Sequence, residues 1–256
     1  MPDHPPAPAD PSLAHPSLAP PCPAQPPLAD TAAAGPPRKL TPRQEERRRR
    51  ILAVAQAQIS ELGYEAMTMR GIAAASGTAE KTLYNIFGTK DRLVAQAARY
   101  RSGNAFAEAA RRAGQPGWDL LLAFCDVASE WTQETPILSR GLALVLADHA
   151  ELVGLGQIYE TYVGASLRAM MAGGMLAPAM PLAVVVRVVR LAVVATVVFW
   201  ARGELSDAEL RAYLRLRMAE SLLPHAAPGG GAIIACAQGA TRQLADLAAS
   251  APAMEG

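Results

Sequence analysis

Cysteine is scarce in this sequence of 256 residues, which contains only three. Cys22, Cys125 and Cys236 lie far apart, and no CxxC pair occurs. An odd number of widely spaced thiols predicts neither a zinc site nor a disulfide framework. We favour the interpretation that the three cysteines are free thiols without a functional role in a reducing cytoplasm. The N-terminus also lacks the charged start and apolar core of a secretory signal, so we expect a cytoplasmic protein.

Enzyme motifs are missing as well. The sequence contains no GxSxG, Walker loop, dinucleotide fingerprint or HExxH. His149 beside Asp148 fits a metal or ligand contact, but a satisfied loop histidine is favoured. We therefore expect no enzyme, no metal and no cofactor. Several aromatic and Met residues could line a pocket, but their helical spacing favours plain core, so no ligand residue is assigned: Trp118, Phe124, Trp131, Tyr159, Tyr162, Met170 and Met171.

The net charge of only +1 hides an uneven distribution. Residues 1–37 contain three acids and no base, a net −3. Residues 38–104 contain thirteen Lys or Arg and six Asp or Glu, a net +7, and residues 105–256 contain eleven and fourteen, a net −3. Positive charge confined to one segment is the pattern of a phosphate-binding surface. A solvated basic face is the alternative.

Proline is concentrated at the N-terminus, where residues 1–37 hold 13 of the 21 prolines. Such a segment has no apolar periodicity and cannot repay its ordering entropy. We expect a disordered Pro/Ala-rich tail over residues 1–40, with a proline-rich ligand for another domain as the alternative.

Residues 68–87, TMRGIAAASGTAEKTLYNIF, predict two short helices joined by a tight turn. Thr68 suits an N-cap, Ser76 and Gly77 stop the first helix, and Thr78 is the expected cap of the second. Leu83 and Phe87 are four residues apart and share the inner face. The outer face is polar, which suits a DNA major groove, and an ordinary helical hairpin is the alternative; its residues are Glu80, Lys81, Thr82, Tyr84 and Asn85.

Two longer helices flank this pair. The run Thr41-Pro42-Arg43-Gln44 is a capping box that opens a helix to Leu62, ended by Gly63. A basic cluster, Arg47 to Arg50, lies in its first half, where the helix dipole disfavours cations. Thr89 is expected to cap a fourth helix, with Lys90 in its first turn and an end near Arg112.

Residues 45–105 resemble the DNA-binding domain of the TetR family of bacterial transcriptional regulators. The matching positions are Ile51, Leu52, Ala55, Gly63, Tyr64, Thr68, Ile72, Ala73, Ser76, Gly77, Thr82, Leu83, Tyr84, Phe87, Lys90 and Leu93. The resemblance implies an all-α fold with a three-helix helix-turn-helix domain over residues 41–105. It also implies a helical ligand-binding and dimerisation domain over residues 106–225, followed by a loop, a short helix and a tail over 226–256.

The resemblance assigns roles to particular residues. Thr68, Thr82, Tyr84 and Lys90 would contact phosphates, and Arg70, Glu80, Lys81 and Asn85 would lie at or near base edges. Lys can donate to guanine, Asn can pair with adenine and Glu can accept from cytosine. The sequence departs from the family pattern at Gly71, Ala79, Glu80 and Ile86, so relatives do not predict the operator.

The C-terminal part is expected to be helical over residues 118–134, 136–147 and 149–171, and again over 206–223, where Ser206 and Glu209 form a capping box. Residues 182–202 include nine valines, with Arg187 and Arg190 among them. A helix buried between protein partners is favoured over a membrane helix, which the two arginines oppose, and over a long strand. Val194 is expected on its partner-facing stripe.

The resulting prediction is a ligand-responsive repressor that binds a palindromic operator in double-stranded DNA as a homodimer. The resemblance implies that helices 182–202 and 206–223 pair with their copies, and that a small-molecule effector, of unknown identity, releases the DNA. Three alternatives remain: an activator of the same fold, an all-helical membrane-associated protein anchored through 182–202, and a small-molecule-binding enzyme.

Overall fold

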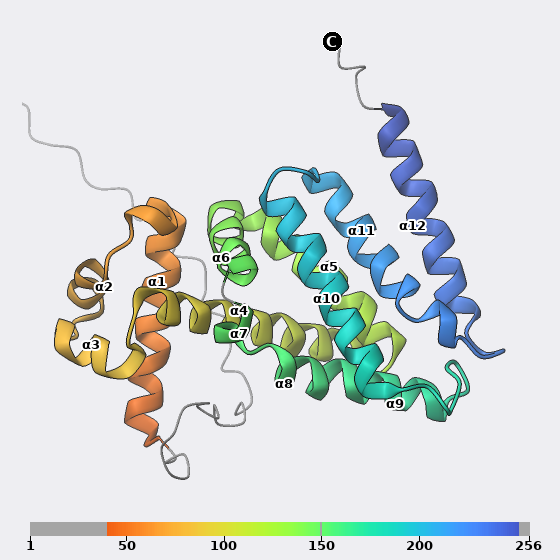
Figure 1. Cartoon of the computed structure of the whole chain (residues 1–256), viewed down its shortest axis with the longest axis horizontal. Coiled ribbons are helices and arrows are strands. Elements are labelled where there is room, and N and C mark those ends of the chain that lie inside the picture. Colours follow the sequence, from red (N-terminus) through yellow and green to blue (C-terminus); the bar gives the residue numbers. More distant parts are fainter. Residues whose placement is uncertain (1–39, 149, 251–256) are drawn as a thin grey trace, which may run out of the picture. The chain divides into compact units, whose positions relative to one another are not determined.

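The computed structural model describes residues 40–148 and 150–250, all within one compact unit (Figure 1). Within those ranges the chain forms helices and no strand, which confirms the all-α prediction. Residues 1–39 of the predicted tail and His149 lie outside the described residues. In order, the elements are α1 (Pro42–Ala66), α2 (Met69–Ser76), α3 (Glu80–Phe87), α4 (Lys90–Ala113), α5 (Trp118–Glu134), α6 (Pro136–Asp148), α7 (Ala150–Val153), α8 (Gly156–Tyr159), the π-helix η1 (Glu160–Gly164), α9 (Ala165–Ala172), α10 (Leu182–Ala201), α11 (Asp207–Glu220), the 3₁₀ helix η2 (Leu223–His225) and α12 (Gly231–Ser250).

Helix α1 begins as its sequence predicts. The Thr41 side chain accepts from the backbone of Gln44, and the Gln44 side chain accepts from the backbone of Thr41. Gly63 breaks the helical conformation with φ +78°, and one more turn continues to Ala66. The apolar side of α1 packs on α4 and α6. Helices α1 and α6 approach closely at Gly141, where a Cβ would lie 2.8 Å from the Ile59 side chain.

Helix α4 connects the two ends of the fold. It packs against α1, α5, α6 and α7, and Figure 1 shows it running from the α3 end toward the C-terminal helices. Its N-terminal half buries Leu93 and Val94, and its C-terminal half buries Phe106 and Ala109. Residue 105, the expected domain boundary, lies inside this helix, so one continuous element joins the two parts.

An aromatic cluster fills the core where α4, α5, α8 and η1 meet. The Phe106 and Phe124 rings stack with their centroids 3.8 Å apart, and Tyr162 stacks on Phe106 at 5.2 Å. Tyr159 meets Phe106 edge-on at 5.1 Å. Such ring arrangements add to the free energy gained by burying the same area.

The prediction of one helix over residues 149–171 is wrong. The chain forms α7, turns at Gly154 with φ +59°, and continues through α8, the π-helix η1 and α9. Glycine adopts that left-handed conformation without a Cβ clash. The guanidinium of Arg99 on α4 donates to the carbonyls of Val153 and Gly154, which holds the turn in place.

Residues 182–201 form the helix α10, which rules out the strand and leaves two of the three interpretations, a membrane helix and a helix buried between protein partners. It is long and apolar enough to cross a membrane by length and composition, with a mean hydropathy of 2.4. One side packs on α6 and α11 and buries Val185, Val189 and Val193. Val194, expected to face a partner, is half-buried and packs against the core of its own chain.

The end of the described chain holds more structure than predicted. The short helix expected over residues 233–247 is the 20-residue α12. Ile233, Ala237 and Ala240 form its buried face, and α12 packs on α11 (Figure 1). Helix α11 therefore contacts α5, α10 and α12.

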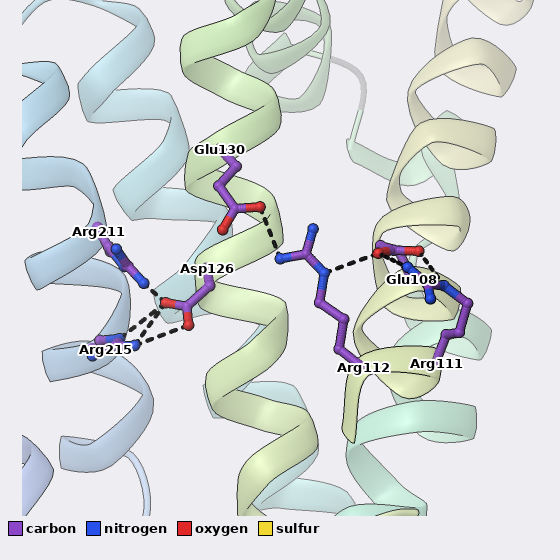
Figure 2. A network of polar contacts seen from close by, with 7 residues as sticks. All are labelled: Glu108, Arg111, Arg112, Asp126, Glu130, Arg211 and Arg215. Atoms are coloured by element: carbon purple, nitrogen blue, oxygen red, sulfur yellow. Dashed lines mark hydrogen bonds and ion pairs between the residues drawn. The ribbon is translucent and has the colours of Figure 1, made fainter. Parts of the chain in front are cut away.

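Ion pairs join three of these helices (Figure 2). Asp126 on α5 accepts from both Nε and Nη2 of Arg215 and from Nε of Arg211, at 2.8 to 3.1 Å. On the other side of α5, Arg112 of α4 bridges Glu130 and Glu108. Hydrogen bonds from Arg111 and Arg112 lower the pKa of Glu108 to about 2. These ion pairs connect α5 to α11 on one side and to α4 on the other, at the protein surface.

A substitution in the aromatic cluster tests the core. Phe106→Ala removes the ring on which two other rings stack, so it should lower the free energy of unfolding by about 3–5 kcal/mol. Ile137→Ala is the control, because Ile137 is 57% exposed and the expected change is within about 0.5 kcal/mol. Urea denaturation followed by circular dichroism measures both, and equal losses would contradict the placement of Phe106.

Candidate nucleic-acid interface

The turn between α2 and α3 forms as the sequence predicts. The Thr68 hydroxyl accepts from the Gly71 backbone at 3.0 Å and caps α2. Gly77 ends α2 in the left-handed conformation, φ +62° and ψ +33°, and its N–H donates to the carbonyls of Ala73 and Ala74. Leu83 and Phe87 on α3 are buried. The two helices therefore form a helix-turn-helix whose second helix is anchored by one apolar face.

The N-cap of α3 is not the predicted one. Helix α3 begins at Glu80, its N-cap is Ala79, and no side chain caps it. Thr78 lies one residue earlier, because its backbone N–H donates to the Ala73 carbonyl and completes the end of α2. Its hydroxyl is buried and has no hydrogen-bond partner among the described residues. Helix α3 thus leaves its first backbone N–H groups free for another acceptor.

The outer face of α3 presents two predicted base-reading residues, Lys81 and Asn85, and two predicted phosphate contacts, Thr82 and Tyr84. Lys81 and Asn85 are exposed, and Tyr84 is 47% exposed. Thr82 is half-buried. These side chains point away from the face that Leu83 and Phe87 bury, so donors and acceptors converge on the side a duplex would approach.

Arg70 of α2 and Glu80 of α3 face each other across the turn. The Arg70 Nε lies 3.6 Å from a Glu80 carboxylate oxygen, and the Arg70 side chain is 88% exposed. An ion pair this open adds little stability. It does shield the one carboxylate on a helix that would meet a polyanion.

Thr68 caps the start of α2, the helix before α3, and Lys90 is the first residue of α4, the helix after it. Thr89 caps α4 by accepting from the Arg92 backbone, and Lys90 is the first residue of that helix. The Lys90 ammonium donates to the Glu65 carbonyl at 3.3 Å and lies 4.3 Å from the centre of the Tyr64 ring. The Tyr64 hydroxyl in turn contacts the Asp91 carboxylate. Lys90 therefore also ties the end of α1 to the start of α4, a structural role that the sequence did not reveal.

The remaining residues considered as ligand or metal contacts pack in the core or belong to no metal-binding cluster. Trp118, Phe124, Tyr159 and Met170 are buried. Burial raises the pKa of the Cys125 thiol. Among the described residues no three His, Cys, Asp or Glu side chains gather as a metal site would require.

Comparisons with known proteins agree with this geometry. Residues 51–97 match the family of bacterial regulatory proteins described as the tetR family. No curated protein matches the chain.

Solved structures share the fold. A TetR transcriptional regulator from Rhodococcus sp. RHA1 is 17% identical, with a TM-score of 0.54 over 69% of this chain and 97% of that one. The TetR-family repressor FadR of Thermus thermophilus, solved with lauroyl-CoA, is 22% identical, with 0.54 over 72% and 100%. SmeT, which represses the multidrug efflux pump SmeDEF of Stenotrophomonas maltophilia, is 20% identical, with 0.53 over 72% and 92%.

The missing cap gives a prediction for stability. Ala79→Ser should supply a hydroxyl that accepts from the free N–H groups at the start of α3, and should raise the free energy of unfolding by about 0.5–1 kcal/mol. Ala79→Val, which has no acceptor, is the matched control and should give no gain. Urea denaturation decides the point: an equal effect of both variants would mean that α3 does not begin at Glu80.

Proposed function

The helix-turn-helix of this chain is that of the TetR family of transcriptional regulators, and from this premise we propose a cytoplasmic repressor that binds a palindromic operator as a homodimer and is released by a small-molecule effector. The carrying observation is the exposed polar face of α3 opposite its buried Leu83 and Phe87. In this proposal Lys81 and Asn85 read base edges in the major groove, with Arg70 and Glu80 beside them. Thr68, Thr82, Tyr84 and Lys90 contact phosphates and fix the register.

The dimer rests on α10. Four large apolar side chains remain exposed along one face of this helix, at i, i+4, i+7 and i+15: Val184, Val188, Leu191 and Phe199. A contiguous apolar stripe is normally covered, and a second copy related by a two-fold axis is the commonest cover. Helix α11, expected to share the interface, has part of its surface covered by α12. We therefore place α10 at the centre of the interface and α11 at its side.

Effector release would act through α4. This helix carries Lys90 at one end and Phe106 in the aromatic cluster, and Arg99 and Arg101 bind it to neighbouring carbonyls. An apolar molecule inserted among Phe106, Phe124 and Tyr159 would repack the cluster and shift α4. Binding that is tighter in the shifted state moves the population away from the DNA-bound spacing. The lauroyl-CoA bound to the Thermus thermophilus FadR makes an acyl chain the first molecule to test.

We favour repression over activation, because two proteins of similar structure, SmeT and the Thermus thermophilus FadR, are repressors. The test is selection of binding duplexes from a random library by the purified chain, followed by gel-shift assays. We expect an inverted repeat whose half-site centres lie roughly 34–36 Å apart or a multiple of that spacing. Recovery of no enriched sequence from several rounds would overturn the proposal.

Two lysines separate base reading from phosphate binding. Lys81→Ala should cost about 1–3 kcal/mol at one base pair and relax specificity there, whereas Lys90→Ala should weaken all duplexes alike and reduce the salt slope by about 1. Fluorescence anisotropy on operator and random duplexes at several salt concentrations measures both effects. Thermal melting of Lys90→Ala is the control, because its ammonium also binds the Glu65 carbonyl. Identical losses on both duplexes for both variants would contradict the assignment.

Leu191 tests the dimer without disturbing the subunit. It is 57% exposed, so Leu191→Asp should leave the helical signal intact while placing a carboxylate in the apolar interface. We expect a monomer at micromolar concentration and weak operator binding, seen by sedimentation and anisotropy. Val194→Asp is the comparison, since that half-buried side chain also faces its own core and should lower the melting temperature as well. A wild-type monomer that binds a palindrome tightly would disprove the dimer.

A further inference from the structure

Five arginines lie in the first half of α1, and the structure sorts them into three groups. Arg48 turns inward, where it donates to the Gln96 side chain and lies 5.3 Å from the centre of the Phe87 ring. Arg49 forms an ion pair with Glu46 at 2.6 Å. Arg43, Arg47 and Arg50 have no ion pair or hydrogen bond from their side chains within residues 40–148 and 150–250.

These three unpaired arginines share one face of α1. Their spacing of four and three residues puts them in one row along the helix. Together with Thr41, Gln44 and Glu46 they line an open hollow. Arg43 and Arg50 are exposed, and Arg47 is half-buried with its Nε atom enclosed and without a partner. The row therefore presents three guanidinium groups toward one region of solvent.

None of the described residues forms an ion pair with these three arginines. Like charges three and four residues apart repel each other on a helix, and cations in the first turns oppose the helix dipole. Glu46, the one carboxylate in the hollow, is already bound by Arg49. Some arginines elsewhere pair with carboxylates, such as Arg112 with Glu108 and Arg215 with Asp126 (Figure 2). An unpaired row in the most basic segment points to an anion that comes from outside.

The position of the row identifies that anion. Phe87 is the last residue of α3, and the contact of Arg48 with its ring places the second turn of α1 beside the C-terminal end of the proposed reading helix (Figure 1). The row lies on the same turns of α1 as Arg48 but on a different side of the helix, the side open to solvent. A duplex seated on α3 continues past that end as a row of phosphates. We propose that Arg43, Arg47 and Arg50 bind the phosphate backbone of the DNA that flanks the bases read by α3. This inference rests on the proposed function and extends the interface beyond the helix-turn-helix.

The experiment measures the salt dependence of binding to a labelled duplex of random sequence. Removing one phosphate contact should reduce the slope of log K against log[salt] by about 0.9. We therefore expect the slope of the triple variant Arg43→Ala, Arg47→Ala, Arg50→Ala to be lower by about 2–3, and equally on a selected operator. Arg49→Ala is the matched control on the same helix, and its slope should stay at the wild-type value.

A triple lysine variant, Arg43→Lys, Arg47→Lys, Arg50→Lys, keeps the charge and should restore the slope. Circular dichroism and thermal melting establish that the alanine variant folds. If the wild type binds and the alanine variant has the same slope, the flanking contact is wrong while the proposed function stands. If Arg49→Ala reduces the slope by as much per removed charge as the triple alanine variant, the effect comes from the overall positive charge of α1. The row is then not a phosphate-binding site. If the wild type binds no duplex, the proposed function fails first.

Discussion

Helix α4 is buried on both halves of its length, and this burial links the DNA-binding end of the chain to the C-terminal helices. Leu93 and Val94 pack at one end and Phe106 and Ala109 at the other, with no break between them. Close-packed interiors deform little, and in the proposed mechanism a change around Phe106 is therefore taken up by a shift of α4 as a whole. The coupling between effector and DNA that we propose needs no separate relay.

Buried charge holds α4 in its position. Burial lowers the pKa of Arg101 to about 10, yet the group remains a cation at neutral pH and must be hydrogen-bonded. It donates to the Trp131 carbonyl and to the hydroxyls of Thr135 and Ser139, at the junction of α5 and α6. Arg99 does the same at the Gly154 turn. The sequence did not reveal either arginine as a structural residue, because their acceptors lie 30 or more positions away.

Local signals explain what the sequence could predict. The caps at Thr41, Thr68, Thr89 and Ser206 formed as expected, since capping depends on residues within three positions. The prediction that Thr78 caps α3 was wrong, because the Thr78 backbone N–H donates to the Ala73 carbonyl at the end of α2. The residue type alone does not show this. The faces of α10 could not be assigned, because nine valines give no contrast between inside and outside. The arginines of α1 looked like one cluster, and only the packing of Arg48 on Phe87 separated them.

The packing of α10 also bears on the two uses weighed for this apolar helix, a membrane span and a contact with a partner subunit. A span needs its whole circumference to face lipid or other buried protein. In this fold one side of α10 packs on α6 and α11, and Arg187 is exposed on another. The same helix cannot keep those contacts and cross a bilayer alone. The exposed part of α10 includes a stripe of four large apolar side chains, and in the proposed dimer this stripe is the contact surface for one partner helix.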